Sequence, residues 1–322
     1  MTSGRTRYRL YDVIVESDTD LSLAVAKQRP AVDESDDRPW RYTEGAVPQA
    51  GGRLVHDVLD FDGQRRLQVH FDGDRRVYFS HGDTRALWDG TQCQITLEPG
   101  ADMSLRPAIM LERVIAPIAL LLLRDRQVAL HASAVADVRG RAQIFVGDSG
   151  AGKSTTALEL MRRGMTILAD DLVMLDGERR LLSATPSVRL FDRPRDVPEA
   201  IDEQQVRPDI DKYWYQLGNC IDVEHHPQVA AIFSLEPEQQ RREPVIEPVR
   251  GREATVRVIA QAFDLTEIDA DWRTRRFRTL CDLARQVPVY RVRYARGDRQ
   301  QPDQVRALAH HFGIDDGGGD GR

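Results

Sequence analysis

IFVGDSGAGKSTTALELMRRG, residues 144–164, joins an apolar run to a helical pattern through a glycine-rich turn. The turn matches the phosphate-loop pattern G-x-x-x-x-G-K-[ST] at every fixed position, through Gly147, Asp148, Ser149, Gly150, Ala151, Gly152, Lys153 and Ser154. Glycines let backbone N–H groups surround phosphate oxygens, and the start of a helix adds partial positive charge. The stretch therefore predicts a strand, a nucleotide-binding loop and a helix.

The residues after the last glycine of such a loop carry its chemistry. Lys153 would reach the β- and γ-phosphates, the Ser154 hydroxyl would bind Mg²⁺, and Thr155 follows in the first helical turn as part of the nucleotide-binding set. The chain has only two other lysines, Lys27 and Lys212. A glycine-rich turn without a ligand is the alternative, and the strand–loop–helix context weighs against it.

Two adjacent carboxylates, Asp170 and Asp171, end the apolar run MTILA one helix and one strand after Lys153. We expect this run to form a parallel strand next to the strand before the loop, which would bring the pair beside the phosphates. One carboxylate could hold Mg²⁺ or its water while the other accepts a proton from an incoming hydroxyl. The alternative is a pair that only begins a turn.

His131 lies in the strand-like run ALHASAV. Because it alternates with Leu130 and Ala132, its side chain could face a cleft as a catalytic group. A hydrogen-bonded histidine within a strand explains the pattern equally well. Both interpretations stay open on the sequence alone.

Composition restricts the partners of this chain of 322 residues. A formal net charge of −6 and the lack of a basic run with aromatics argue against nucleic-acid binding. Cys93, Cys220 and Cys281 are too scattered for a disulfide framework, which suits a cytoplasmic protein. No secretory signal or membrane span is expected, because the most apolar segment, 107–127, is broken by charges and a proline.

The first part of the chain, 1–104, is expected to form a small β-rich domain. Short alternating runs such as LVHDVLDFDG, RLQVHFDG, RRVYFS and TQCQITLE are separated by Asp-Gly and similar turns, a pattern typical of antiparallel hairpins. The polar stretch at 29–52, with three prolines and a Gly-Gly pair, predicts a long loop.

The second part, 105–314, is expected to be an α/β catalytic domain followed by a loose tail at 315–322. An apolar helix at about 106–124 would lead into it, and Gly164 would close the helix after the loop. The proline-rich segment at 186–208 predicts irregular structure. Further helices are expected at 254–264, 271–286 and 302–313.

LHASAVADVRGRAQIFVGDSGAGKSTTA followed by GMTILADDLVML resembles the catalytic domain of HPr kinase/phosphorylase and its relatives. The resemblance lies in the spacing of His131, Lys153 and the Asp170-Asp171 pair. It implies a P-loop kinase fold related to the nucleotide-binding domain of phosphoenolpyruvate carboxykinase, with ATP and Mg²⁺ as cofactors. It also implies that Asp170 is the base for a seryl hydroxyl and that Asp171 lies nearer the metal.

The sequence departs from the bifunctional members of that family after the aspartate pair. Those enzymes carry Glu-[Ile/Val]-Arg-Gly there, with the glutamate on the metal, whereas this chain has SVRL at 187–190. The reverse, phosphorolytic reaction is therefore in doubt. Looser similarity extends to shorter, divergent relatives, some of which phosphorylate the C-terminal serine of lasso peptides. The candidates for neutralising phosphate or binding an acidic acceptor are Arg189, Lys212, Arg250 and Arg252.

The sequence thus predicts a kinase that transfers the γ-phosphate of ATP to a hydroxyl of a peptide, protein or small molecule. The expected catalytic residues are Asp170, Lys153 and His131, with Ser154 and Asp171 at Mg²⁺. One alternative is a bifunctional HPr(Ser) kinase/phosphorylase. Another is a nucleotide-binding switch that transfers nothing. Self-association into a homo-oligomer is left open, because no heptad pattern appears.

Overall fold

The computed structural model describes most of the chain in segments. These are residues 5–10, 13–18, 39–59, 65–72, 75–81, 84–98, 126–182, 187–191, 193, 196–198, 200–207, 212–218, 226–239, 243–263, 270–295 and 301–314. The expected domain boundary after residue 104, the apolar helix at 106–124 and the tail at 315–322 lie outside the described residues.

The chain forms two compact units. One consists of Met1–Arg124 with Asp264–Arg273, and the other of Asp125–Phe263 with Thr274–Arg322. The first is rich in β-structure and the second is an α/β unit that carries the glycine-rich loop. This confirms the predicted fold class. None of the helices in the described part of the chain has both the length and the hydrophobicity needed to cross a bilayer.

The first unit contains an eight-stranded sheet in the order β1-β2-β3-β8-β7-β6-β5-β4. Its strands are β1 (Thr6–Leu10), β2 (Val13–Ser17), β3 (Trp40–Glu44), β4 (Arg53–Leu59), β5 (Arg65–Phe71), β6 (Arg76–His81), β7 (Thr84–Asp89) and β8 (Gln94–Glu98). All neighbours pair antiparallel except β2 with β3 and β3 with β8, which are parallel. The predicted run of hairpins is therefore confirmed.

One strand of this sheet contradicts the predicted loop at 29–52. β3 lies inside it, with Trp40 and Tyr42 buried and Arg41 between them exposed. This alternation is the pattern of a strand with one buried face, but it is short and prolines flank it on both sides. The Trp40 ring packs against that of Trp88 on β7, with centroids 5.3 Å apart.

The second unit is built on a six-stranded sheet in the order β12-β10-β11-β17-β19-β18. Its strands are β10 (Ala132–Ala136), β11 (Ala142–Val146), β12 (Thr166–Ala169), β17 (Val229–Glu238), β18 (Val245–Val249) and β19 (Val289–Ala295). The central pairs β11 with β17 and β17 with β19 are parallel, whereas the outer strands pair antiparallel with their neighbours. Two small sheets accompany it, β9 (Val128–Leu130) with β13 (Val173–Leu175), and β14 (Ser187–Phe191), β16 (Lys212–Leu217) and β15 (Ala200–Arg207) in that order.

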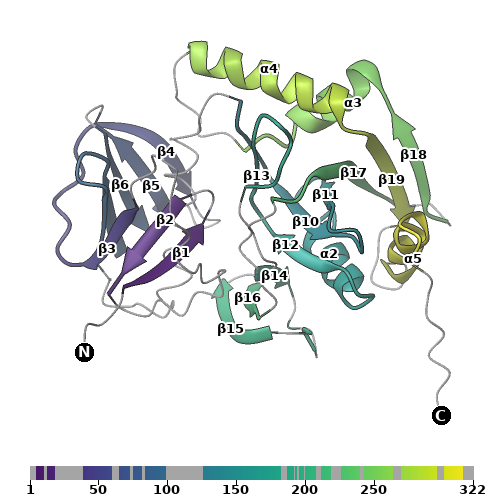
Figure 1. The fold of residues 1–322 in the computed structure, drawn as a ribbon, viewed down its shortest axis with the longest axis horizontal. Helices are drawn as coiled ribbons and strands as arrows, with labels where there is room; N and C mark the ends of the chain where they lie inside the picture. Colours follow the sequence, from purple (N-terminus) through teal and green to yellow (C-terminus); the bar gives the residue numbers. More distant parts are fainter. Residues whose placement is uncertain are drawn as a thin grey trace. The chain divides into compact units, whose positions relative to one another are not determined.

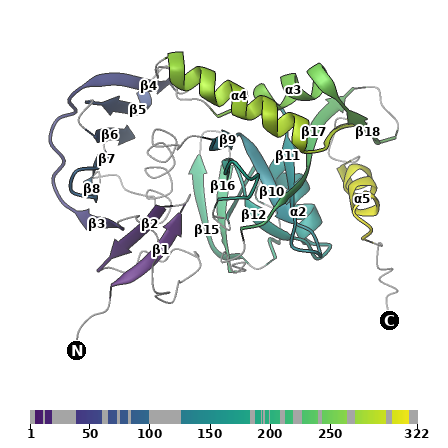
Figure 2. The same cartoon turned by 45° about the horizontal axis from the view of Figure 1, so that its top comes forward.

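Helices cover both faces of the six-stranded sheet (Figures 1 and 2). They are α2 (Lys153–Met161), α3 (Gly251–Ile259), α4 (Ala270–Gln286) and α5 (Gln301–His311). Side chains alternate along the strands, so Ile144 packs in the core beneath α3 and α4, while Phe145 packs in the core with α2 and α5. The loop after β11 therefore emerges from a rigid, fully buried strand.

The predicted irregular segment at 186–208 is also wrong in part. It contains β14 and β15, which pair on either side of β16. Val188 and Leu190 on β14 join the same core as Tyr215 on β16. The prolines on either side obscured this short alternation in the sequence.

Candidate active site

The glycine-rich loop follows β11 and wraps back over the end of β17. A Cβ atom on Gly147 would lie 2.8 Å from the carbonyl oxygen of Leu235, so only glycine fits without a shift of backbone. Gly150 and Gly152 have φ angles of 81° and 82°, which glycine adopts at little cost. The loop conformation is therefore specified by these three residues.

Helix α2 begins directly at the loop, with Gly152 at its N-cap and no side chain capping it. The first N–H groups of a helix have no partner within the helix, and they carry the positive end of its dipole. Lys153 and Ser154 are the first two residues of α2. The loop thus presents backbone donors, an ammonium group and a hydroxyl at one point.

Lys153 is held inside the loop. Its Nζ atom donates to the carbonyl oxygens of Gly147 at 2.7 Å and Asp148 at 3.3 Å, and the residue is only 7% exposed. Burial lowers the pKa of Lys153, and the nearby charges of Asp171 and Asp170 oppose this shift. An anion placed at the loop would favour the charged ammonium further.

Asp170 is almost completely buried at the end of β12, and both its oxygens accept hydrogen bonds. Oδ1 accepts from the hydroxyls of Ser133 on β10 and of Ser154, the latter at 2.9 Å. Oδ2 accepts from the backbone N–H of Arg189 on β14 at 2.8 Å. One carboxylate therefore connects the phosphate loop to two further elements.

The sheet brings the loop and the aspartates together, although not by the predicted pairing. β12 was expected beside β11, whereas β10 lies between them. Because β10 pairs antiparallel with both, β11 and β12 run in the same direction and end at the same edge of the sheet. Ser133 on the intervening strand fills the gap between the two.

Asp171 has quite different surroundings from its neighbour. Its φ angle of 75° lies in the left-handed region, and its side chain is 40% exposed. The carboxylate lies 3.3 Å from Nη1 of Arg189 and 3.3 Å from Nδ1 of His131. Burial opposes ionisation of Asp171, but the charges of Arg189 and then Lys212 hold its pKa below the ordinary range.

His131 joins this group by two contacts with Asp171. Besides its approach to the carboxylate, Nδ1 lies 3.0 Å from the Asp171 carbonyl oxygen. The histidine backbone N–H donates to the carbonyl oxygen of Gln261. Of the two interpretations left open by the sequence, the structure shows a hydrogen-bonded histidine that also borders the exposed carboxylate.

The four candidate cations separate into two places. The charges of Arg189 and Lys212 act on Asp171, and Lys212 also lies over the Phe191 ring, 5.3 Å from its centroid. Arg250 and Arg252 instead stand at the start of α3.

Comparison with known proteins finds relatives that match short segments of the chain. No protein-family model matches the chain. An HPr kinase/phosphorylase of Treponema pallidum is 39% identical over 102 residues, which is 30% of this chain and 29% of that protein. HPr kinase/phosphorylases of Caldanaerobacter subterraneus and Levilactobacillus brevis are 42% and 43% identical over 64 and 68 residues, about a fifth of each chain. Over these segments the chain is similar to HPr kinase/phosphorylases.

The matches span less than a third of the length of these curated relatives. Among solved structures, the HPr(Ser) kinase/phosphatase from Coxiella burnetii aligns at 14% identity with a TM-score of 0.27, over 58% of this chain and 97% of that one. The resemblance predicted from the spacing of His131, Lys153 and the aspartate pair is confirmed over the matched segments.

The site at the phosphate loop offers oxygen donors of the kind Mg²⁺ prefers. Ser154 Oγ and Asp170 Oδ1 lie 2.9 Å apart at the end of the loop. Mg²⁺ is usually held by one or two protein oxygens together with substrate phosphates and water, so this donor set fits the ion. Among the described residues, no three His, Cys, Asp or Glu side chains form a metal site by themselves.

Two residues of the candidate site were not found from the sequence. Ser133 stands two positions after His131, and the alternation of a strand could have indicated it. Tyr294, on β19, donates its hydroxyl hydrogen to the carbonyl oxygen of Ala151 within the loop. Tyr294 and Ala151 are 143 positions apart, so no local pattern in the sequence predicts their contact.

Proposed function

We propose that this protein is a phosphotransferase that moves the γ-phosphate of ATP, with Mg²⁺, to a hydroxyl group of a peptide, protein or small molecule. The observation that carries the proposal is the contact between Ser154 of the loop and the buried Asp170, beside the exposed Asp171. Phosphoryl transfer needs little covalent help from a protein. It depends on positioning and on neutralising charge, and this site supplies both.

The loop would hold the triphosphate. Backbone N–H groups at the start of α2 would donate to phosphate oxygens, and Lys153 would leave the carbonyls of Gly147 and Asp148 to reach the β- and γ-phosphates. Bound Mg²⁺ neutralises developing charge on the phosphate oxygens. We propose Ser154 and Asp170, whose oxygens lie 2.9 Å apart, as the residues that would hold it.

The sequence predicts Asp170 as the proton acceptor and Asp171 as the metal ligand. The contacts favour the opposite assignment. Asp170 is 1% exposed and already accepts three hydrogen bonds, so an acceptor hydroxyl has little access to it. A base must lie within hydrogen-bonding reach of the proton that it removes. Asp171 is open to solvent and bordered by His131 and Arg189, so we propose it as the proton acceptor.

A seryl hydroxyl is the acceptor that the family relationship favours. The curated relatives are named as both kinases and phosphorylases of HPr. In this chain Ser187 stands where the bifunctional enzymes carry the glutamate of Glu-[Ile/Val]-Arg-Gly, whereas the arginine is kept as Arg189, which contacts both aspartates. We therefore propose the forward kinase reaction.

Intact-mass analysis tests this proposal directly. The full chain is incubated with Mg²⁺ and ATP together with serine-ended peptides, HPr and small hydroxyl compounds, in parallel with an Asp171→Asn variant. Asp282→Asn, an exposed carboxylate on α4, is the matched control. A phosphate mass gain on one acceptor, lost only in Asp171→Asn, is expected. ATP binding without transfer to any acceptor or to water would contradict a kinase and support a nucleotide-dependent switch.

A further inference from the structure

A pocket rich in arginine lies within the α/β unit, apart from the phosphate loop. It has a volume of about 590 Å³ and is bordered by the start of β9, the turn after β13 and one side of α4. Its charged lining residues are Arg126, Arg179, Arg275, Arg278, Asp176 and Asp282. A Cβ atom on Gly177 would lie 2.8 Å from Cβ of Arg126, so the turn packs closely on the start of β9.

The two carboxylates of this pocket are already paired. Asp176 accepts from Arg180 at 2.8 Å, and Asp282 lies 3.3 Å from Nη1 of Arg285. Neither of these two arginines lines the pocket. The carboxylates therefore do little to offset the charge of the arginines that do line it.

Three of the lining arginines have no carboxylate partner within the part of the chain that the structure describes. They are Arg126, Arg179 and Arg278. Arg126 and Arg278 are exposed to solvent, and Arg179 is half-buried. Their guanidinium groups come from three separate elements, so the pocket presents positive charge from several sides.

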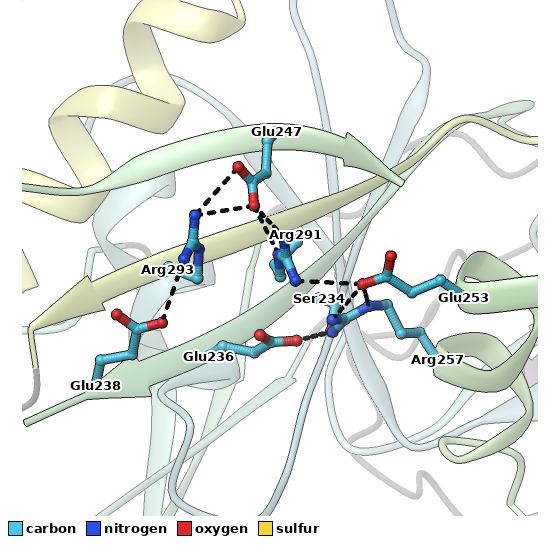
Figure 3. A network of polar contacts seen from close by, with 8 residues as sticks. All are labelled: Ser234, Glu236, Glu238, Glu247, Glu253, Arg257, Arg291 and Arg293. Carbon is cyan, nitrogen blue, oxygen red and sulfur yellow. Dashed lines mark hydrogen bonds and ion pairs between the residues drawn. The ribbon is translucent and has the colours of Figure 1, made fainter. Parts of the chain in front are cut away.

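Another group of arginines shows the contrary arrangement (Figure 3). Arg257 on α3 donates to Glu253 at 2.9 Å, and Arg291 on β19 contacts the same carboxylate oxygen at 3.3 Å. Glu247 on β18 accepts from Arg291 at 2.8 Å and from Arg293 at 3.1 Å. Each arginine of that network has its anion inside the protein. The arginines of the pocket can gain an anion only from a partner.

The pocket is connected to the candidate active site by the ribbon of β9 and β13, which pair antiparallel. His131 follows β9 and Asp171 precedes β13, so both lie at one end of the ribbon. Arg126 and Asp176 lie at the other end. An extended chain rises about 3.3 Å per residue, so the five positions from Asp171 to Asp176 span no more than about 17 Å. A peptide of about five to eight residues can cover that distance.

Both ends of the ribbon carry strained backbone. In the described part of the α/β unit, the residues other than glycine with left-handed φ angles are Asp171 at one end, and Arg126 and Arg179 at the other, with φ of 71° and 65° for the two arginines. A side chain makes this conformation costly, and such residues are common at binding sites. The strain thus marks the pocket in the same way as it marks the exposed aspartate.

The lining of the pocket suits carboxylates on a peptide better than other anions. Guanidinium groups bind carboxylates through paired hydrogen bonds. Three such groups on separate elements match several carboxylates spaced along a chain better than one compact ion. The described lining residues include no aromatic ring on which a nucleic-acid base could stack.

We propose that this pocket docks an acidic segment of a peptide or protein acceptor and thereby brings the acceptor hydroxyl to Asp171. The inference rests on the proposed function and names its substrate class. The acceptor carries carboxylates about five to eight residues from the hydroxyl that receives the phosphate.

Transfer kinetics with three peptides of equal length test the proposal. Each carries one serine and a short block of glutamates placed about six residues before the serine, about six residues after it, or replaced by glutamines. One acidic peptide should have a KM roughly tenfold or more below that of the glutamine peptide, because several ion pairs form at once. Equal KM values for all three peptides would overturn the docking site.

Charge reversal locates the effect in the pocket. Arg126→Glu combined with Arg278→Glu should raise the KM of the preferred acidic peptide roughly tenfold or more and leave transfer to the glutamine peptide unchanged. Unchanged transfer to the glutamine peptide also shows that the variant is folded. Arg139→Glu combined with Arg306→Glu is the matched control, since it changes the net charge equally at exposed positions in the turn after β10 and on α5. An equal rise of KM in the control would show general charge attraction and contradict docking.

Binding without transfer separates this inference from the proposed function. Fluorescence anisotropy with labelled hexaglutamate, which has no hydroxyl to phosphorylate, should show binding that only the pocket variant loses. If that result holds but no acceptor is phosphorylated, the docking site stands and the kinase does not. If the serine peptides are phosphorylated but hexaglutamate does not bind, the kinase stands and the docking site does not. Tighter binding of hexauridylate, or displacement of the peptide by an equal concentration of inorganic phosphate, would also overturn the docking of an acidic peptide.

Discussion

Asp170 and Asp171 are neighbours in the chain, yet their carboxylates have opposite surroundings. The left-handed φ of Asp171 turns its side chain away from that of Asp170, so one is buried among hydroxyls and the other borders solvent. A non-glycine residue in this region is strained and is held there by its contacts, which here include Arg189 and His131. Carboxylates with different environments can serve different roles in one reaction.

Substitution of each aspartate should therefore have a different effect. Asp171→Asn is expected to reduce the transfer rate by a factor of roughly 10² to 10⁴, the usual contribution of a general base, with ATP affinity preserved. Asp170→Asn should instead weaken the Mg²⁺-dependent part of ATP binding, because it replaces the acceptor at Ser154. Single-turnover rates and titrations with and without Mg²⁺ distinguish the two. The reverse pattern would restore the assignment made from the sequence.

Gly147 in the loop and Gly164 after α2 are not equivalent. Gly147→Ala would bring a Cβ atom to 2.8 Å from the Leu235 carbonyl, whereas Gly164→Ala meets nothing within 4 Å and has only an unfavourable φ of 92°. We expect Gly164→Ala to lower the free energy of unfolding by about 1–2 kcal/mol, with nucleotide affinity unchanged. Gly147→Ala should lower both the free energy of unfolding and the nucleotide affinity. Chemical denaturation and ATP titration measure these effects, and equal nucleotide affinities would argue against the role of the backbone contact.

At the scale of elements, the β10–β11 hairpin delivers both Ser133 and the phosphate loop to the site. Its turn is held by Asp137, which accepts from the backbone N–H groups of Arg139 and Arg141 at 2.9 and 3.0 Å and from the side chain of Gln143 at 3.0 Å. Burial opposes ionisation of Asp137, but these bonds hold its pKa below the ordinary value. The carboxylate is therefore a pH-dependent support of the hairpin.

Asp137→Asn should destabilise the fold at neutral pH by roughly 1–3 kcal/mol. The NH₂ group of the asparagine would face N–H groups that now donate to the carboxylate, so their hydrogen bonds would be lost. Since the folded-state pKa is lowered, the stabilisation is present above the ordinary aspartate pKa of about 3.9 and disappears as pH falls through the folded value. The difference in free energy of unfolding between the two proteins should thus shrink on acidification. Urea unfolding across that range measures it, and a constant difference would contradict the assignment.

Elements with strong local signals were predicted from the sequence, and those that depend on distant partners were not. The strand, loop and helix around Lys153 follow from glycines and helical spacing within twenty-one residues. β3 and β14 were taken for loop or irregular structure because prolines flank them, and their stability comes from pairing with distant strands. The spacing between the phosphate loop and the aspartate pair indicated where the site lies. Strand alternation after His131 points to Ser133, but its contact with Asp170 depends on a strand order that the sequence does not show.

At the scale of the whole α/β unit, the C-terminal segment braces the phosphate loop. Tyr294 on β19 donates to the Ala151 carbonyl, and Gln304 on α5 donates to Thr156 on α2 at 3.1 Å. The residues of these pairs are 143 and 148 positions apart. Packing of α5 against α2 adds the fully buried Val305 to the core beneath the loop.

Tyr294→Phe should therefore loosen the loop without disturbing the sheet. It leaves the Ala151 carbonyl without its donor, which costs about 1–3 kcal/mol of stability when an acceptor stays buried. We expect weaker binding of both ATP and inorganic tripolyphosphate, because the loop holds the phosphates of each. Calorimetric titration of Tyr294→Phe and the unmodified protein with each of the two compounds measures the effect. Unchanged tripolyphosphate affinity in Tyr294→Phe would show that the loop keeps its shape without this bond.

The bracing of the loop by β19 and α5 also bears on how the chain is made. Synthesis proceeds from the N-terminus, so the loop sequence leaves the ribosome well before Tyr294 and Gln304 have been added. A nascent chain that has completed α2 still lacks both contacts. The ability to bind nucleotide should then arise late, once the last strand and helix have joined the sheet, and a chain cut short before β19 should have no working phosphate site.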